Sequence, residues 1–381
     1  MWRMFWVYLL YILINKCLSY NRDVVSCLKV CSFPCYAKEN TEVCPRHEHF
    51  NFIDWESNLP LGSRIKHESM ASGSALNGLY RPRSALARAM YEKHRNDRYL
   101  QEFDQNEWYN VDKSKLSQEM QEKFVQLHPD KETQEFLSES IDKSTWIWTQ
   151  LWYLLAKSVL RHFWTTTDIN GWLGRGSMFV LSESQTRLLL NRVHWDSSQP
   201  SAMVDVGAGD GEVSSRFAHL FSAKYATEIS ASMRKVLSSK GYTVLDADKW
   251  SEQQQFECVF MLNLLDRCSK PRVMLRQASS ALREGGLLVL ALVLPYKPYV
   301  EVTQDHKPEE RLLIQGTGFE EQASSFVKFM QEEMGYELAA WSKVPYLCEG
   351  DFAQAYYWLD DSVFDCDSEV DRCAYLSTDD W

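Results

Sequence analysis

The segment Ala202–Glu212, with the sequence AMVDVGAGDGE, constrains the fold of this 381-residue chain more than any other. An apolar run that ends in an acid and three alternating glycines is typical of a β-strand that turns tightly into a helix, where missing Cβ atoms let a nucleotide approach the backbone. Glu228 lies 23 residues after Asp205, at the end of a second short apolar run. An acid at about this distance accepts hydrogen bonds from ribose hydroxyls, which favours a cofactor site over a glycine-rich turn without a ligand.

The glycine spacing separates two candidate cofactors. A dinucleotide fingerprint requires a third glycine or alanine where Glu212 stands, and here the glycines run G-x-G-x-G. S-adenosylmethionine fits better because it has no pyrophosphate, and because acids near its ammonium and sulfonium groups are favourable. We therefore expect S-adenosylmethionine, and a nicotinamide oxidoreductase is the rival class. The cofactor-binding residues expected from this turn are Asp205, Gly207, Gly209 and Glu228.

The order of predicted elements after the turn is regular. Strands are expected at 242–245, 256–262 and 286–294, helices at 271–283 and 320–334, and a final antiparallel hairpin at 336–343 and 355–364. Alternating strands and helices predict an α/β, doubly wound, mostly parallel seven-stranded sheet, the Rossmann-like architecture of a class I methyltransferase, preceded by a helical segment. Ligands bind outside the carboxyl ends of such strands, which places Asn263–Cys268 beside the cofactor.

The charge of the chain bears on its partners. The formal net charge is −11, and residues 107–381 alone carry 27 basic against 41 acidic side chains. This acidic surface would repel a phosphate backbone, so nucleic acid is not expected as a substrate and a neutral or cationic protein segment is favoured. Residues 349–381 hold ten acids and one arginine, which predicts a solvated acidic tail from 367 to 381 in preference to an interaction tail.

The N-terminus resembles a targeting segment. Eleven apolar residues from Met4 to Ile14 match the central region of a secretory signal, so residues 1–19 are expected to be a signal peptide cleaved after Ser19, or an uncleaved anchor and the only route to a membrane. The expected location is the endoplasmic reticulum or secretory pathway, with the mitochondrion as the alternative. Oxidising conditions would permit disulfides, with zinc as the less favoured alternative, at Cys27, Cys31, Cys35 and Cys44. No metal site is expected elsewhere.

The segment between this N-terminus and the glycine turn has two parts that differ in their sequence pattern. Residues 20–106 are expected to be a cysteine-containing segment and a poorly ordered linker, with a short helix at 84–95. From Trp108 onwards, amphipathic stretches at 115–126 and 145–164 predict helices, the second aromatic-rich and packed on the core. A methyltransferase domain with N-terminal helices is thus expected over 107–366.

Several strings give the chain a specific resemblance. They are NGWLGRGSMF at 170–179, DVGAGDGE at 205–212, NLLDRC at 263–268, LALVLPYKPYVE at 290–301, PYLCEGD at 345–351 and YYWLDDSVF at 356–364. The region from about 107 to 364 resembles the DREV family of methyltransferase-like proteins, which methylate the pros nitrogen (Nδ1) of protein histidines. The segment 20–106 is longer than the family's N-terminal part and lies outside the resemblance.

The resemblance implies roles for single residues. Glu228, Asn263 and Tyr346 match cofactor-binding positions of the family, and Asp266, with Asn263 beside it, matches an acid near the target imidazole. The family's targets are His-x-His tracts with a small middle residue, so proteins carrying such tracts are the expected partners. The chain's own His47-Glu48-His49 has a bulky acid in the middle, and self-modification there is not indicated.

The chemistry independently favours an acid at the acceptor site. Attack by the pros nitrogen requires the tautomer whose proton is on the other ring nitrogen, and a carboxylate that accepts this N–H selects the tautomer and stabilises the positive ring. Asp266 is our candidate, and a strand-end cap or a partner of Arg267 is the structural alternative. Core packing is the alternative for Tyr346. For Arg175 and Ser177, closure over the cofactor and a structural turn are both open. Another nucleophile, or a non-catalytic cofactor-binding scaffold, is the alternative function.

Overall fold

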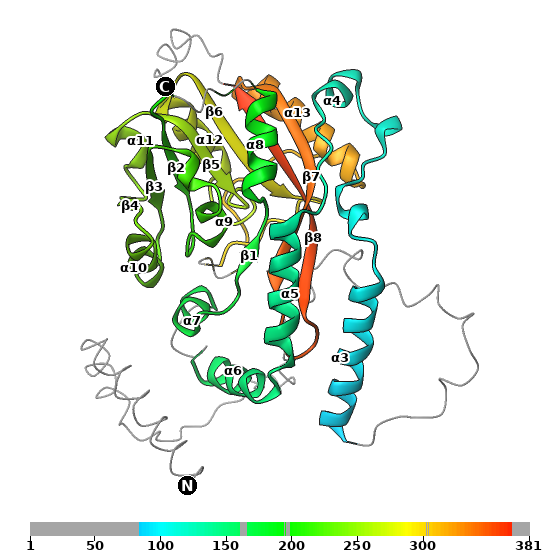
Figure 1. Ribbon diagram of the computed structural model, residues 1–381. Helices are drawn as coiled ribbons and strands as arrows, with labels where there is room; N and C mark the ends of the chain where they lie inside the picture. The colour runs from blue at the N-terminus through cyan, green and yellow to red at the C-terminus, as the bar shows by residue number, and fades with distance from the viewer. Residues whose placement is uncertain are drawn as a thin grey trace, which may run out of the picture. The chain divides into compact units, whose positions relative to one another are not determined.

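The core of the structure is an eight-stranded sheet with the order β1-β7-β8-β6-β5-β2-β3-β4 (Figure 1). The computed structural model describes residues 84–367 apart from 161–165, 194, 196–198, 302 and 304. Five neighbouring strands are parallel, because their pairs β2–β3, β3–β4, β2–β5 and β5–β6 all run in the same direction. These strands are β2 (Ala202–Val206), β3 (Ala223–Thr227), β4 (Thr243–Leu245), β5 (Phe256–Leu262) and β6 (Leu282–Val293). β5 is apolar from Cys258 to Leu262 because both faces of the sheet are covered there.

Three strands complete the sheet in antiparallel orientation. β7 (Glu337–Glu349) and β8 (Tyr356–Asp367) form the predicted final hairpin, which is longer at both strands than expected. The expected seven strands become eight because β1 (Met178–Phe179) adds to the edge of β7 through the pairs Met178–Cys348 and Phe179–Leu347. A two-residue strand has no readable alternation, so its sequence pattern could not predict it. The doubly wound, mostly parallel architecture is confirmed.

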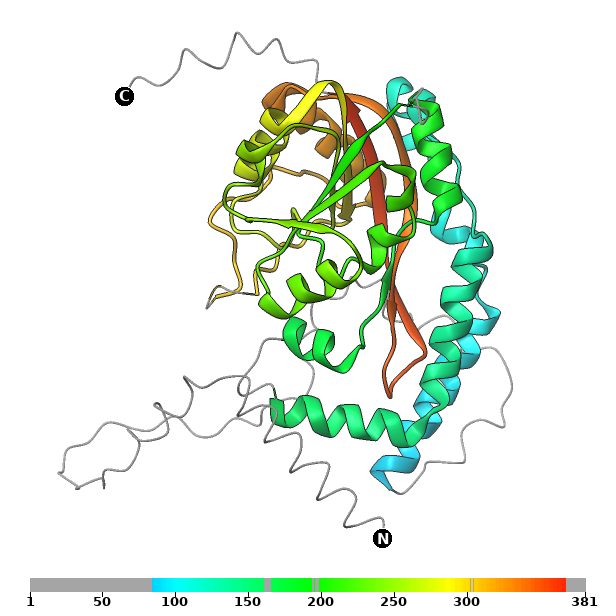
Figure 2. The ribbon, with the colours of Figure 1, turned by 60° about the vertical axis from the view of Figure 1, so that its left-hand side comes forward.

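Helices cover both faces of the sheet (Figures 1 and 2). One face packs against α11 (Trp250–Gln253), α12 (Pro271–Ala281) and α13 (Phe319–Met334), with Trp250, Leu275 and Phe326 fully buried. The opposite face packs against α8 (Glu183–Arg192), α9 (Glu212–Ser215), α10 (Ala231–Ser239) and short turns at 105–109 and 218–220. Each helix buries one apolar stripe, and α13 ends where Gly335 adopts a left-handed conformation.

The helices before the sheet partly differ from expectation. The helix expected at 84–95 is confirmed as α3 (Ala85–Glu102), which is longer and is capped by Ser84, so this part of the expected linker has defined structure. The stretch 115–126 forms only a short turn at 113–115 and α4 (Gln118–Lys123), because Phe124 leaves the helix to bridge with Trp341 in β7. The structure continues through α5 (Lys131–Thr145), α6 (Ile147–Leu160) and α7 (Thr166–Leu173).

Contrary to the prediction, the aromatic-rich helix α6 does not pack on the core. The chain turns between α5 and α6, and α6 lies crosswise below α7, beyond the end of the sheet (Figures 1 and 2). Trp148 is 81% exposed and Trp146 is 59% exposed. Leu155 and Val159, seven and eleven residues after Trp148, are exposed on the same side of the helix. The expectation was wrong because a hydrophobic stripe specifies burial only if a partner surface lies opposite it.

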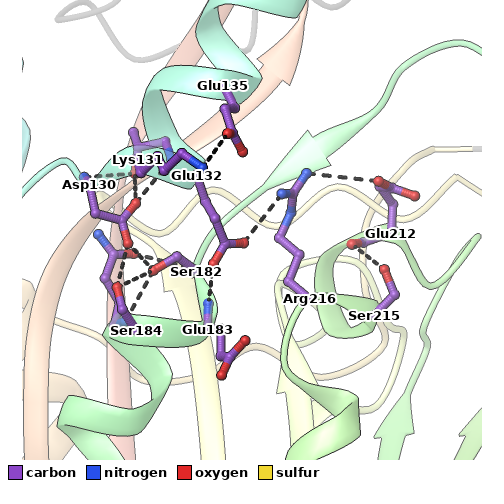
Figure 3. Close-up of polar contacts among 12 residues, drawn as sticks. Asp130, Lys131, Glu132, Glu135, Ser182, Glu183, Ser184, Glu212, Ser215 and Arg216 are labelled. Atoms are coloured by element: carbon purple, nitrogen blue, oxygen red, sulfur yellow. Dashed lines mark hydrogen bonds and ion pairs between the residues drawn. The ribbon is translucent and has the colours of Figure 1, made fainter.

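A polar network joins the N-terminal helices to the sheet region (Figure 3). Asp130 caps α5 by accepting a hydrogen bond from the Thr133 amide, and it also accepts from the hydroxyls of Ser182 and Ser184 at the start of α8. The Glu183 amide donates to Glu132 at 3.0 Å. Arg216, just after α9, lies 3.6 Å from Glu132 and 3.8 Å from Glu212, and its guanidinium covers the Phe179 ring. These contacts connect α5 to α8, α9 and β1.

Some expectations fall outside the described residues. These are the signal segment 1–19, the four N-terminal cysteines, the linker up to residue 83 and the acidic tail after 367. Among the helices that are described, none combines the length and apolar character needed to cross a membrane. Within the same part of the chain, no group of three or more His, Cys, Asp or Glu side chains is arranged to hold a metal ion.

Candidate cofactor and acceptor site

The glycine turn lies between β2 and α9 and is bonded to β3. The amides of Gly207 and Ala208 donate to the Thr227 carbonyl at 3.1 and 3.0 Å, and the Gly209 amide donates to Glu228 Oε2 at 2.9 Å. These N–H groups therefore have partners inside the protein, unlike the open row of amides that cradles a pyrophosphate. The geometry favours a cofactor without a pyrophosphate, in agreement with the glycine spacing.

Two glycines of the turn have different reasons to lack a side chain. Both have positive φ, +73° at Gly207 and +57° at Gly209. A Cβ on Gly207 would lie 2.7 Å from Leu264 Cδ1, so this glycine allows the turn to pack on the end of β5. A Cβ on Gly209 would meet no heavy atom within 4 Å. The turn is thus closed against the protein at Gly207 and open at Gly209, where a ligand has room.

Glu228 follows β3 and is held in a fixed orientation. Its carboxylate accepts from the Ser230 amide at 2.8 Å through Oε1 and from Gly209 through Oε2, and the residue is only 8% exposed. A carboxylate has about four acceptor positions, so two remain for ribose hydroxyls. The next residue, Ile229, is 69% exposed. Adenosine combines a ribose with an apolar base. The Glu228 carboxylate suits the ribose hydroxyls, and the exposed Ile229 side chain beside it suits the base.

Asp205 lies beneath the turn, within β2, and is 3% exposed. Its pKa is raised to about 7, mainly by burial; a hydrogen bond with the Ser214 side chain opposes this rise and the negative charge of Glu228 contributes to it. Asp205 therefore links β2 to α9 under the turn, and a positive charge bound above it would favour its ionised form. The structure does not place Asp205 on the open side with Gly209.

Asn263 stands at the carboxyl end of β5 with φ +57°, a left-handed conformation that asparagine tolerates better than most residues. Its backbone amide donates to the Ala291 carbonyl at 3.0 Å. Its side-chain Nδ2 donates to Asp361 Oδ2 at 2.8 Å, whereas its Oδ1 is enclosed and has no hydrogen-bond partner. A buried acceptor without a partner requires an explanation, and at the carboxyl end of a parallel strand a ligand N–H or O–H would satisfy it.

Asp266 presents a second enclosed acceptor three residues later. It is 3% exposed; its Oδ2 lies 3.2 Å from Arg267 Nε, and its Oδ1 has no hydrogen-bond partner. Burial raises the pKa of Asp266, and the adjacent guanidinium opposes this shift. The pairing with Arg267 that we considered as a structural alternative is present, but it occupies one oxygen and leaves the other free.

Tyr346 extends from β7 toward the same cluster. Burial raises the pKa of its hydroxyl well above the ordinary value. The positive charge of Arg267 opposes this rise, and the negative charges of Asp266 and Asp361 add to it. Its hydroxyl donates to Met178 Sδ in β1. The structure thus brings Tyr346, Asn263 and Asp266 together at the carboxyl edge of the sheet, although Tyr346 contacts the edge strand as well.

Arg175 makes the structural contacts that one of the two alternatives for this turn predicts. Its Nη1 lies 2.6 Å from Glu349 Oε1, and its Nη2 donates to the Gly350 carbonyl at 3.0 Å. The Ser177 amide donates to Glu349 Oε2 at 3.4 Å. Both residues therefore attach the segment after α7 to the end of β7.

Sequence reasoning missed three residues of the site. Asp361 pairs with Asn263, Ile229 flanks Glu228, and Asp168 in α7 accepts hydrogen bonds from the hydroxyls of Ser230 and Ser232 at the start of α10. The signal for Asp361 was present in YYWLDDSVF, where a charged residue interrupts an apolar strand. A buried acid in a strand needs a partner, and that requirement could have marked it.

Comparisons with known proteins identify a family for most of the chain. A family model described as DREV methyltransferase matches residues 108–367. The chain is also similar to three solved methyltransferase structures. They are the N-methyltransferase NodS from Bradyrhizobium japonicum in complex with S-adenosyl-L-homocysteine (12% identity, 49% of this chain and 88% of that chain, TM-score 0.32), a putative RNA methyltransferase from Pyrococcus horikoshii (14%, 47% and 82%, 0.33) and a putative methyltransferase from Bacillus halodurans (12%, 48% and 99%, 0.32).

Proposed function

Because the chain belongs to the DREV methyltransferase family, we propose that it transfers a methyl group to the pros nitrogen of histidine in His-x-His tracts of proteins. It is a methyltransferase that uses S-adenosylmethionine. The observation that supports a histidine acceptor is the enclosed Oδ1 of Asp266, a carboxylate oxygen without a partner at the carboxyl end of β5. The free Oδ1 of Asn263 lies on the same strand end.

The cofactor supplies an electrophilic methyl group on a sulfonium. In the transfer, the imidazole Nδ1 lone pair forms a bond to the methyl carbon while the carbon–sulfur bond breaks, and the sulfur leaves as a neutral thioether. The protein must mainly position the ring and keep Nδ1 unprotonated. Free imidazole has a pKa near ~6.5 and is largely neutral at pH 7, so no strong base is required for attack.

Asp266 orients and stabilises the ring in this proposal. Its Oδ1 accepts the N–H on the far nitrogen, which holds the tautomer with a free Nδ1 lone pair and offsets the positive charge that develops on the ring. Arg267 holds the other oxygen at 3.2 Å and favours the ionised carboxylate against the effect of burial. After the transfer, Asp266 can accept the Nε2 proton of the methylated imidazolium, which leaves a neutral ring.

The proposed substrate is a protein segment of neutral or positive charge. The acidic balance of residues 107–381 favours such a partner and disfavours nucleic acid. A small middle residue in His-x-His would leave room for the ring to approach Asp266 at the carboxyl end of β5. We further propose that the enzyme acts on proteins of the secretory pathway, on the basis of the apolar run from Met4 to Ile14.

Single-turnover methylation of an Ala-His-Ala-His peptide at saturating cofactor tests the role of Asp266. Asp266→Asn should lower the rate roughly a hundredfold or more, because removing an electrostatic partner of the transition state costs about 2–4 kcal/mol, while cofactor binding stays nearly unchanged. Asn263→Ala and Glu228→Ala should instead weaken cofactor binding first. Asp360→Asn is the matched control, because Asp360 is an acid in β8 that pairs with Lys343 at 3.2 Å.

Two results would contradict the proposal. A folded Asp266→Asn variant with the wild-type rate would leave Asp266 as a structural partner of Arg267 only. Mass spectrometry of the product must also show the methyl group on the pros nitrogen. Modification of a lysine, of the other ring nitrogen or of no residue in His-x-His peptides would remove histidine as the acceptor and leave the methyltransferase chemistry standing.

A further inference from the structure

Asp361 lies directly behind Asn263 and is completely buried. It belongs to β8, where it is paired in register with Val293, the last residue of β6, and with Val344 of β7. Its side chain is therefore at the edge of the sheet where β5 and β6 end. Its two oxygens have separate partners: Oδ2 accepts from Asn263 Nδ2 at 2.8 Å and Oδ1 accepts from the Ser362 amide at 2.9 Å.

This arrangement determines which end of the Asn263 carboxamide is available. A carboxamide has one donating and one accepting end, and an ionised carboxylate can only accept. Burial raises the pKa of Asp361 to about 8, and the hydrogen bonds that Asp361 accepts from Asn263 and the Ser362 amide oppose this rise and favour the ionised form. With Asp361 accepting, the nitrogen of Asn263 must face β8 and the oxygen must face away from it. The left-handed backbone of Asn263 (φ +57°) fixes the direction of the side chain, so Asp361 needs only to set the rotation of the amide.

We propose that Asp361 is a positioning residue that holds the Asn263 carboxamide with Oδ1 as an acceptor for an N–H or O–H group of bound S-adenosylmethionine. Asp361 itself touches no cofactor in this assignment and acts only through Asn263. The inference rests on the site proposed above, in which Asn263 binds the cofactor, and it does not depend on histidine being the methyl acceptor.

The same strand supplies a matched control. Asp365 lies four residues after Asp361 on the same face of β8, about 13 Å away along the strand. It is 1% exposed, and neither of its oxygens has a hydrogen-bond partner. Replacing Asp365 by asparagine therefore removes a buried acid from β8 without altering Asn263.

Calorimetric titration with S-adenosylhomocysteine tests the inference without any methyl transfer. Asn263→Ala and Asp361→Ala should each raise the Kd roughly tenfold, the loss expected for one buried hydrogen bond. The double variant should be no weaker than Asn263→Ala alone, because Asp361 acts through Asn263. Asp365→Asn should leave the Kd unchanged. Thermal unfolding of each variant confirms that it is folded.

Exchanging the two side chains gives a rescue. In Asn263→Asp combined with Asp361→Asn, the amide at position 361 can donate to one oxygen at position 263 and leave the other oxygen as the free acceptor. The exchanged protein should bind within about threefold of wild type and more tightly than Asp361→Ala. Because this pair keeps the volume at both positions, it also tests the inference if Asp361→Ala does not fold.

The outcomes separate the two levels of the argument. If Asn263→Ala leaves the Kd unchanged, Asn263 is not in the cofactor site and the site proposal fails together with this inference. If Asn263→Ala weakens binding while Asp361→Ala does not, the inference alone fails. It also fails if the losses multiply in the double variant, since Asp361 would then act independently of Asn263, or if the exchanged pair binds no better than Asp361→Ala.

Discussion

The buried carboxyl of Asp365 should make the stability of the protein depend on pH. Burial raises its pKa to about 8, and repulsion from Asp367 adds to the shift. In the unfolded chain the pKa is near ~3.9, so between about pH 4 and pH 8 the folded state binds a proton that the unfolded state has lost. Stability from this group is fully present below pH 4 and decreases as the pH rises, by about 1.4 kcal/mol per pH unit. The decrease is about 4 kcal/mol at pH 7.

Asp365→Asn should remove this dependence, because an amide does not titrate. Urea unfolding at pH 5 and pH 7 gives the test: relative to wild type, the variant should gain about 3 kcal/mol in unfolding free energy between the two pH values. Asp205 and Asp361, which also have raised pKa values, are common to both proteins and cancel in the comparison. Parallel curves for wild type and Asp365→Asn would show that Asp365 is ionised or hydrated in the folded protein.

Two other predictions concern the cofactor and the N-terminus. Gly209→Arg should abolish S-adenosylhomocysteine binding in calorimetry, because the arginine side chain would occupy the open space beside Glu228. Gly285→Arg is the control and should bind normally: Gly285 also has a positive φ and open space at its Cβ position, but it lies near the start of β6. Normal binding by a folded Gly209→Arg variant would place the cofactor elsewhere. The chain should enter the secretory pathway. In cells whose plasma membrane is permeabilised while their internal membranes stay intact, a C-terminal reporter should therefore resist added protease until detergent is present. Digestion of the reporter without detergent would contradict this.

The fold was largely predictable because the parallel strands are buried on both faces. β5 was predicted at the observed residues, since FECVFML is apolar at every position except Glu257 and lies between polar segments. The α6 helix was predicted as a helix but placed wrongly, because its apolar stripe does not encode which surface lies opposite. β1 was missed because two residues have no period, and its pairing depends on where β7 happens to lie.

The site was predictable where its residues follow one another in the chain. The glycine turn and Glu228 form a local unit with a fixed spacing, and the structure joins them by the Gly209–Glu228 hydrogen bond. Asp361 could not be assigned from such spacing, because it is 98 residues from Asn263 and meets it only through the pairing of β8 with β6. Contacts of this kind depend on sheet order and are visible only after the strands are assembled.

The doubly used cap Asp130 has a consequence for how the chain can be shortened. One carboxylate begins α5 and also binds the two serines at the start of α8, so the first turns of both helices depend on the same side chain. Glu132, two residues later, extends this dependence to Arg216 beside the glycine turn. A fragment that starts after α5 would retain every glycine and acid of the cofactor motif. It would, however, leave the hydroxyls of Ser182, the N-cap of α8, and of Ser184 without their shared acceptor, and Arg216 without one of its acids. We therefore expect a stable methyltransferase fragment to begin before residue 130, some seventy residues ahead of the first parallel strand.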